Sequence, residues 1–163
     1  MTRVGFGYDI HRLVEGRPLW LGGVEIAHDR GLLGHSDGDA AAHAVADALL
    51  GAAGLGDIGV NFPSDDPRYH NASGVSLLAE TAARIRARGY RPVQVDLTVV
   101  AEGPKLAPHR ESMITALAGA LGLAQGAIAI KARTNEGLDA IGRGEAIAAY
   151  AVVLIERRNP PGE

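Results

Sequence analysis

Hydrophobic and polar residues alternate regularly between residues 92 and 101, where Val93, Val95, Leu97 and Val99 are separated by polar side chains. A period of two is typical of a strand with one buried face. Shorter apolar segments bounded by turn residues also predict strands. These segments are residues 3–11, a strand pair within residues 18–26 that bends at Gly22-Gly23, and residues 127–134.

A spacing of three to four residues between apolar positions predicts three helices. The helices span residues 39–53, 74–88 and 107–121, and their expected buried stripes are Val45-Leu49-Ala53, Leu78-Ala82-Ile85 and Met113-Leu117-Leu121. Ser36 and Asp39 resemble a capping box before the first helix, Ser73 is expected to cap the second, and Gly54, Gly89 and Gly122 are expected to end the three. Arg84, Arg86 and Arg88 are expected on the solvated side of the second helix, and residues 27–39 and 55–72 are expected to be loops.

Residues 146–155 are apolar at nearly every position. A strand that is apolar on both faces is expected to be buried on both faces. Three helices can cover only one face of a small sheet, so another copy of the chain is the simplest cover for the other face. The pattern therefore predicts an α+β fold with a mixed sheet of four to five strands, helices on one face, and a homo-oligomer in which sheets pack together.

Length and charge restrict the possible functions. The 163 residues predict a single catalytic domain over residues 1–157, followed by a short tail over residues 158–163. The formal net charge is −3 and neither half of the chain is strongly basic, which argues against a nucleic-acid partner. No apolar run reaches about 18 residues and the N-terminus has no secretory signal, so we expect no membrane partner and a cytoplasmic location.

The chain contains no cysteine, so any metal must be held by His, Asp or Glu. Asp9 and His11 are two positions apart on a predicted strand and therefore share one face. His43 lies one turn beyond Asp39 in the first predicted helix. Three protein ligands with an open position are typical of a catalytic zinc site. The alternative is that the pair is an ordinary polar strand end, while His43, Asp37 and Asp39 serve the start of the helix. His28, His70 and His109 are expected at the surface.

Several turns could bind phosphate. Gly103-Pro104-Lys105 precedes the third helix, whose N-terminus offers free N–H groups, and Lys105 and Lys131 are the only lysines. Residues 133–136 and 142–145 add charged side chains beside predicted strands. Each of these segments could equally be an ordinary solvated turn. Neither a Walker sequence nor a Gly-x-Gly-x-x-Gly segment that opens a helix is present, so the common nucleotide-binding folds are excluded.

Taken together, these motifs closely resemble the 2-C-methyl-D-erythritol 2,4-cyclodiphosphate synthase family. The resemblance extends over essentially the whole chain, with the motifs in family order. It rests on residues 7–11, 33–39 with His43, 48–52 with 56–59, Phe62-Pro63, Pro104-Lys105 and 142–145.

The resemblance implies an enzyme of non-mevalonate isoprenoid biosynthesis. Its substrate would be 4-diphosphocytidyl-2-C-methyl-D-erythritol 2-phosphate, whose 2-phosphate attacks the β-phosphorus and expels CMP. Such an intramolecular reaction needs no protein nucleophile, because the task is to orient the substrate and to neutralise charge.

The resemblance also assigns roles to residues. Asp9, His11 and His43 match zinc ligands, and Glu136 matches the ligand of a second ion, Mg²⁺ or Mn²⁺. His35 and Thr134 match the residues that position the reacting phosphates. The expected substrate-binding residues are Ile10, Ser36, Asp57, Ile58, Gly59, Phe62, Asp65, Asp66, Ala101, Pro104, Lys105, Leu106, Ala107, Arg133 and Arg143. Arg133, Asn135 and Ser64 depart from the family pattern.

The family also implies a homotrimer whose active sites lie between subunits, with the metal half from one chain and the cytidine half from its neighbour. Two other functions remain open. Two histidines and one carboxylate can form the facial triad of a non-haem iron oxygenase. The chain could also be a trimeric sensor that binds a metal and a nucleotide without turnover.

Overall fold

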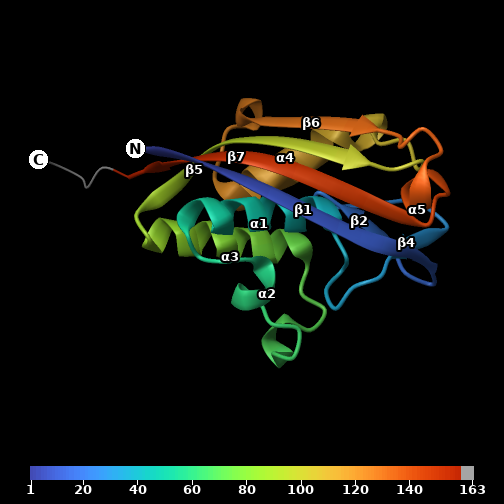
Figure 1. Cartoon of the computed structure of the whole chain (residues 1–163), viewed down its shortest axis with the longest axis horizontal. Coiled ribbons are helices and arrows are strands. Elements are labelled where there is room, and N and C mark those ends of the chain that lie inside the picture. Colours follow the sequence, from blue (N-terminus) through green and yellow to red (C-terminus); the bar gives the residue numbers. More distant parts are fainter. Residues whose placement is uncertain (159–163) are drawn as a thin grey trace, which may run out of the picture.

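A computed structural model describes residues 1–158 of the chain. Its centre is a five-stranded mixed sheet in the order β4-β1-β7-β5-β6, in which only β5 and β6 are parallel. Helices α1, α3 and α4 lie on one face of this sheet (Figure 1). No helix in the described part of the chain combines the length and the hydropathy needed to cross a membrane. The five-stranded mixed sheet and its helices confirm the prediction of an α+β fold.

The bounds of the elements are as follows. The strands are β1 Thr2–Glu15, β2 Leu19–Leu21, β3 Val24–Ile26, β4 Arg30–Leu32, β5 Tyr90–Val100, β6 Ile128–Arg133 and β7 Ala146–Arg157. The helices are α1 Ala40–Ala53, α2 Ile58–Asn61, α3 Gly74–Ala87, α4 Arg110–Leu121 and α5 Asp139–Gly142, with 3₁₀ turns η1 Pro67–Tyr69, η2 Ala107–His109 and η3 Gln125–Ala127.

The long elements agree with the prediction, and the strand pair expected within residues 18–26 is present as β2 and β3, but the other short elements were not predicted. Residues 27–39 were expected to be a loop, but β4 pairs there with Leu13–Glu15 of β1. Residues 55–72 contain α2 and η1, and the segment before β7 contains α5. Elements of three or four residues are too short to show a hydrophobic period. Of these short elements, only β2 and β3 had the additional signal of a glycine turn between two apolar segments, at Gly22-Gly23. The expected tail falls mostly on residues 159–163, which lie outside the described residues.

Asp39 is the N-cap of α1, which corrects the expectation that Ser36 begins the cap. The Asp39 side chain is fully buried and accepts hydrogen bonds from the N–H groups of Ala42 (2.9 Å), Gly22 (2.8 Å) and Gly23 (2.7 Å). One carboxylate therefore ties the β2–β3 turn to the start of α1. Ser73 caps α3 as predicted, and Gly54 and Gly122 end α1 and α4 in left-handed conformations. The third helix was expected to begin at residue 107, but residues 107–109 form the 3₁₀ turn η2 and α4 begins at Arg110.

Helix α1 packs directly on the backbone of β1. A β-carbon on Gly5 would stand 1.9 Å from the Ala48 carbonyl oxygen, and one on Gly7 would stand 2.0 Å from that of Ala44. Only glycine can occupy the two strand positions at this spacing. The alanine-rich sequence of α1 and the two glycines of β1 are therefore parts of one close helix–strand contact.

Two of the three arginines expected in solvent on α3 instead make tertiary contacts. Arg84 donates to the carbonyl oxygen and the side-chain oxygen of Asn61 (2.9 and 3.0 Å) and to the Tyr69 hydroxyl (3.1 Å). Arg86 donates to the carbonyl oxygen of Leu121. Period alone cannot distinguish these arginines from solvated ones, because a long side chain can reach past the helix edge.

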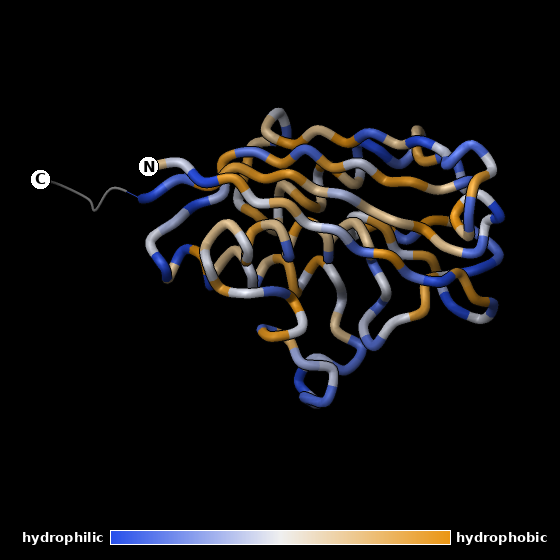
Figure 2. The backbone as a smooth tube through the Cα atoms, viewed as in Figure 1, coloured by the Kyte–Doolittle hydropathy of each residue, from blue (hydrophilic) through white to orange (hydrophobic). Residues whose placement is uncertain are grey.

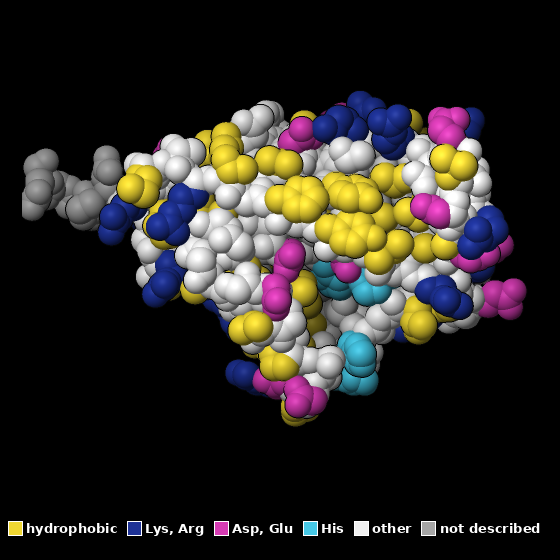
Figure 3. Space-filling model, in the orientation of Figure 1, with side chains coloured by type: hydrophobic (Ala, Val, Ile, Leu, Met, Phe, Trp, Pro, Cys, Tyr) yellow, Lys and Arg dark blue, Asp and Glu magenta, His cyan; other side chains and the backbone are white. Residues whose placement is uncertain are grey.

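The face of the sheet opposite the helices is apolar and uncovered in a single chain. Figure 3 shows a hydrophobic patch on this face, to which Phe6 (63% exposed), Tyr8 (45%), Tyr150 (39%) and Val152 (43%) belong. The inner face of β7 is completely buried, as Ile147, Val153 and Ile155 show. A contiguous exposed apolar patch such as the one on this face of the sheet marks an interaction site. The strands differ in this respect from the turn below α2, residues 63–72, which is mostly hydrophilic in the tube view (Figure 2).

Candidate functional site

Three side chains from β1 and α1 converge at one point. Asp9 and His11 project from the helix-facing side of β1, and His43 projects from the first turns of α1. The Asp9 Oδ2 atom lies 2.9 Å from His11 Nε2 and 3.1 Å from His43 Nδ1, and these two nitrogens are 3.4 Å apart. One ligand atom from each residue lies within 4.8 Å of the others. The close contact between α1 and β1 brings the three expected metal ligands together.

The outer nitrogen of each imidazole also has a partner. His11 Nδ1 lies 2.7 Å from the Leu33 carbonyl oxygen, which can only accept a hydrogen bond. His43 Nε2 lies 3.1 Å from Ser36 Oγ. A proton on each outer nitrogen leaves a lone pair on each inner nitrogen, which is the tautomer that a metal requires. Two imidazoles, one carboxylate and an open side fit a zinc ion of the catalytic type.

The same contacts shift the ionisation of the metal-free cluster. Burial alone would raise the pKa of Asp9, but hydrogen bonds from His11 and His43 outweigh it and lower that pKa below its usual value. Burial alone would lower the pKa of His11, but the hydrogen bond to Asp9 outweighs it and raises that pKa. The low pKa of Asp9 keeps this carboxylate ionised next to the two imidazoles, which suits a position for a cation.

The three residues lie in the wall of a pocket of about 180 Å³. Histidine side chains border a hollow next to the apolar patch in Figure 3. Five further residues of the expected site line the pocket with them, namely His35, Ser36, Ile58, Gly59 and Phe62. The prediction did not include Ser64, Tyr69 and Leu77, which also line it. Tyr69 could have been found from the sequence, because it is the aromatic residue within the otherwise polar segment 63–72.

Among the substrate residues expected in β1 and in the segment 55–72, four do not line this pocket. Ile10 points to the opposite face of β1, because its neighbours Asp9 and His11 face the helices. Asp57 is the N-cap of α2, and its Oδ1 accepts from Val60 N at 2.9 Å. Asp66 caps η1 and pairs with Arg68, while Asp65 is exposed in the same segment. Asp57 and Asp66 therefore have structural partners in the single chain.

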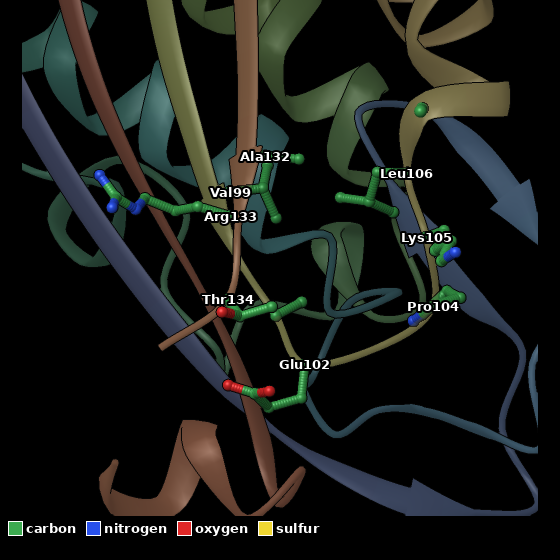
Figure 4. Close-up of a pocket in the computed structure, with 10 residues that line it drawn as sticks. Val99, Glu102, Pro104, Lys105, Leu106, Ala132, Arg133 and Thr134 are labelled. Carbon is green, nitrogen blue, oxygen red and sulfur yellow. The ribbon is translucent and has the colours of Figure 1, made fainter. Parts of the chain in front are cut away.

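A second pocket, of about 220 Å³, lies between β5, β6 and the segment before α4. Seven expected residues line it: Ala101, Pro104, Lys105, Leu106, Ala107, Arg133 and Thr134. In Figure 4, Pro104, Lys105 and Leu106 form one wall, while Arg133 extends away from them across the sheet. The pocket is also lined by Val99, Glu102 and Ala132, which were not predicted. Glu102 directly precedes the predicted motif Gly103-Pro104-Lys105.

Glu102 organises the loop that follows β6. Its Oε1 atom accepts hydrogen bonds from Asn135 N (2.9 Å) and Gly137 N (3.4 Å). Thr134 Oγ1 lies 3.3 Å from a carboxylate oxygen of Glu136, whose backbone is left-handed at φ 54°. The Asn135 side chain donates to the Leu138 carbonyl oxygen (3.0 Å). Asn135 therefore serves the turn itself, and Thr134 and Glu136 place exposed side-chain oxygens next to each other.

Arg143 lines neither pocket. Its side chain is exposed and donates to Glu145 Oε1 at 2.8 Å. This pair follows α5 at the start of β7. The two pockets share no lining residue, and β6, which lines the second, is an edge strand on the far side of β7 and β5 from β1.

Comparisons with known proteins agree with this geometry. Residues 2–156 match the model of the YgbB family. A curated 2-C-methyl-D-erythritol 2,4-cyclodiphosphate synthase from Chromobacterium violaceum is 58% identical over 155 residues, which cover 95% of this chain and 98% of that protein. A solved 2C-methyl-D-erythritol-2,4-cyclodiphosphate synthase with bound CDP is 44% identical, with a TM-score of 0.88 and coverage of 94% of this chain and 100% of that one.

A Plasmodium falciparum IspF–CDP complex is 34% identical, with a TM-score of 0.84 and coverage of 97% of each chain. These two structural alignments therefore cover nearly the whole chain. The chain is therefore an enzyme of the lyase class and belongs to the YgbB family of 2-C-methyl-D-erythritol 2,4-cyclodiphosphate synthases.

Proposed function

We propose that the chain converts 4-diphosphocytidyl-2-C-methyl-D-erythritol 2-phosphate into 2-C-methyl-D-erythritol 2,4-cyclodiphosphate and CMP, and that residues 1–157 act as one catalytic domain. An oxygen of the 2-phosphate forms a bond to the β-phosphorus. The bond from the β-phosphorus to the oxygen that bridges the two phosphates breaks, and that oxygen leaves with CMP. The convergence of Asp9, His11 and His43 in the wall of a pocket is the observation that carries this proposal.

The residues around this pocket orient the substrate. Zinc at Asp9, His11 and His43, and Mg²⁺ or Mn²⁺ at Glu136, would supply positive charge that holds the diphosphate and offsets the charge of the departing CMP. His35, which is exposed at the pocket, contacts the 2-phosphate and aims its oxygen. Ile58, Gly59 and Phe62 contact the erythritol part. Because nucleophile and electrophile belong to one molecule, orientation contributes up to about 7–11 kcal/mol to lowering the barrier.

The second pocket holds the cytidine part. Its apolar wall, which includes Ala101, Leu106 and Ala107, suits a flat base, and backbone groups of this segment read the edge of the cytosine. Lys105 and Arg133 offset phosphate charge at the rim, and the Thr134 hydroxyl donates to the β-phosphate. The CDP named in two related structures supports a cytidine nucleotide as the ligand of this chain.

The working unit is a homotrimer with active sites between subunits. Two observations support it. The two pockets of one chain share no lining residue, so one chain does not form a continuous site from both. The apolar outer face of β1 and β7 also leaves large side chains such as Phe6 in solvent unless another copy covers them. Five expected substrate residues line neither pocket of the single chain. In the trimer these residues contact the substrate or the side chains that bind it: Ile10, Asp57, Asp65, Asp66 and Arg143.

The test is a reaction followed by ³¹P NMR, with purified protein, the phosphorylated cytidylyl substrate and Mg²⁺. We expect CMP and a cyclic diphosphate in equal amounts, with loss of both after chelation of the metal. Metal-loaded protein that binds CDP but forms no product would support the sensor function and reject the proposal. A product that requires dioxygen would support the oxygenase.

A further inference from the structure

Arg17 contacts both ends of the peptide segment that carries His35. It lies in the turn between β1 and β2, and its guanidinium is partly buried. Nη2 donates to the Ser36 carbonyl oxygen at 2.8 Å, and Nη1 donates to the Gly34 carbonyl oxygen at 3.3 Å. Arg17 does not line the metal pocket, so any effect on the reaction must act through these two carbonyl groups.

The segment that Arg17 contacts also carries Ser36, whose side chain contacts one of the candidate metal ligands. Ser36 Oγ lies 3.1 Å from His43 Nε2, on the side of the imidazole opposite the metal position. The remaining backbone contacts of the segment come from residues 71–72: Asn71 N donates to the His35 carbonyl oxygen (3.2 Å), and Asp37 N donates to the Ala72 carbonyl oxygen (3.3 Å). Arg17 alone binds the Gly34 and Ser36 carbonyl groups among the hydrogen bonds of the described residues.

We propose that Arg17 is a positioning residue for the reaction: its guanidinium fixes the 34–36 peptide segment, so that Ser36 Oγ accepts from His43 and the His35 side chain faces the substrate phosphate. The inference rests on the proposed function for the role of His35. The link from Ser36 to His43 does not depend on that role, because it concerns metal affinity alone. A partner of this kind fixes the tautomer and the orientation of a metal-binding imidazole.

The fork of the guanidinium is important to this role. Two parallel N–H groups reach two carbonyl oxygens that are two residues apart, a geometry that a single ammonium group cannot reproduce. The buried Nε makes no hydrogen bond within the described residues, so the two terminal nitrogens carry the whole interaction. Lysine should therefore keep one of the two contacts, whereas methionine should keep neither.

The test compares Arg17→Met, Arg17→Lys and the exposed control Arg88→Met, each with and without Ser36→Ala. The zinc dissociation constant is measured by competition with a chromophoric chelator, kcat and KM are measured with substrate, and the melting temperature is measured without metal. We expect Arg17→Met to raise the zinc dissociation constant and to lower kcat, each by about tenfold. Arg17→Lys should recover part of both losses, and Arg88→Met should change neither.

The Ser36→Ala background separates positioning from general stability. A positioning role predicts that Arg17→Met then causes no further loss of zinc affinity, while its effect on the melting temperature persists. Equal losses of zinc affinity in both backgrounds, or a change in melting temperature alone, would overturn the inference. If Arg17→Met does not fold, Arg17→Lys is compared in both backgrounds by the same criteria. Failure of the proposed function would appear separately, as the absence of cyclic diphosphate with the unmodified chain.

Discussion

The backbone of Gly7 lies so close to that of Ala44 that a β-carbon on Gly7 would stand 2.0 Å from the Ala44 carbonyl oxygen. Gly7 is two residues before Asp9 on the same face of β1, and Ala44 directly follows His43 in α1. The contact therefore sets the distance between the two elements that carry the metal ligands.

Gly7→Ala is expected to weaken the metal site as well as the fold. The added methyl group overlaps backbone atoms, which can yield only if α1 moves away from β1. We expect a loss of about 2–3 kcal/mol in the free energy of unfolding and at least a tenfold rise in the zinc dissociation constant. Denaturant unfolding and chelator competition measure the two effects.

Gly51→Ala is the matched control in the same helix. A β-carbon at Gly51 meets no atom within 4 Å, and its φ is not in the left-handed region. Alanine should stabilise α1 there by about 1 kcal/mol without changing zinc affinity. Equal zinc affinity of Gly7→Ala and the unmodified chain would contradict the proposed effect of helix–strand spacing.

His43→Ala should abolish metal binding and turnover while the chain remains folded. His43 contributes one ligand of three, but the core of large apolar side chains between the sheet and α1, α3 and α4 does not include it. In the absence of metal we expect a stability loss of about 1 kcal/mol, from the hydrogen bonds to Asp9 and Ser36. Zinc content, ³¹P NMR and circular dichroism check the three expectations. A variant that is unfolded at room temperature would show that the site is also structural.

The metal-free protein should show a defined window of pH in which Asp9 and His11 stabilise it. The pKa of Asp9 is lowered by folding, so its contribution exists above the ordinary value of 3.8 and is lost as the pH falls through the folded pKa. The pKa of His11 is raised, so its contribution is complete below the ordinary value of 6.5 and is lost as the pH rises through the folded pKa.

The measurement is the melting temperature of the chain and of Asp9→Asn, both in excess chelator, from pH 4 to pH 9. The difference between them should be largest between about pH 4 and pH 6.5 and should decrease above that range. Zinc affinity should show the opposite trend, because protons compete with the metal as the pH falls. A difference in melting temperature that stays constant over the whole range would contradict this prediction.

Asp39→Ala is expected to be among the most destabilising polar substitutions in the chain. It removes the acceptor of three N–H groups, two of them in the β2–β3 turn, in a fully buried position. The loss should be about 3 kcal/mol, from the helix cap and from the unpaired donors. Asp39→Asn should cost less, because the amide oxygen can still accept from Gly22 and Ala42. Ser73→Ala provides a comparison, since that cap is partly exposed and should cost only about 1 kcal/mol.

Two inactive variants should restore activity when they are mixed. His43→Ala removes the metal half of a site and Thr134→Val the nucleotide half, so each alone is expected to be inactive. If sites lie between subunits, unfolding and refolding an equal mixture should give about one quarter of the activity of the unmodified trimer, because one site in four then pairs two intact halves. Complete inactivity of the refolded mixture, with trimers present, would place each active site within one chain.

The long elements and the candidate metal cluster could be predicted because their signals are local. The alternation in β5 and the apolar spacing of α1, α3 and α4 each lie within one short segment. Asp9 and His11 are two positions apart on one strand, so their side chains necessarily lie on the same face. The resemblance to a known family supplied most of the second pocket.

Other features depend on contacts between distant segments. The strand β4 exists only because β1 extends far enough to pair with it. Arginine is usually exposed to solvent, so Arg84 and Arg17 would be expected at the surface. Instead, their guanidinium groups donate to carbonyl oxygens that are 23 and 17–19 residues away in the sequence. Neither hydrophobic period nor charge reports such a contact, because both describe only neighbours along the chain.

The uncovered face of the sheet also gives the protein an internal optical probe. Tyr8 and Tyr150 lie on this face with their ring centroids 5.0 Å apart, and partial burial together with the neighbouring Tyr150 already raises the pKa of Tyr8. The single tryptophan, Trp20, lies in β2, outside the five-stranded sheet. Two of the four tyrosines thus lie on the apolar face, and the change in ultraviolet tyrosine ionisation that Tyr8→Phe and Tyr150→Phe remove reports on contact there. Tryptophan emission reports on the hairpin that Asp39 anchors.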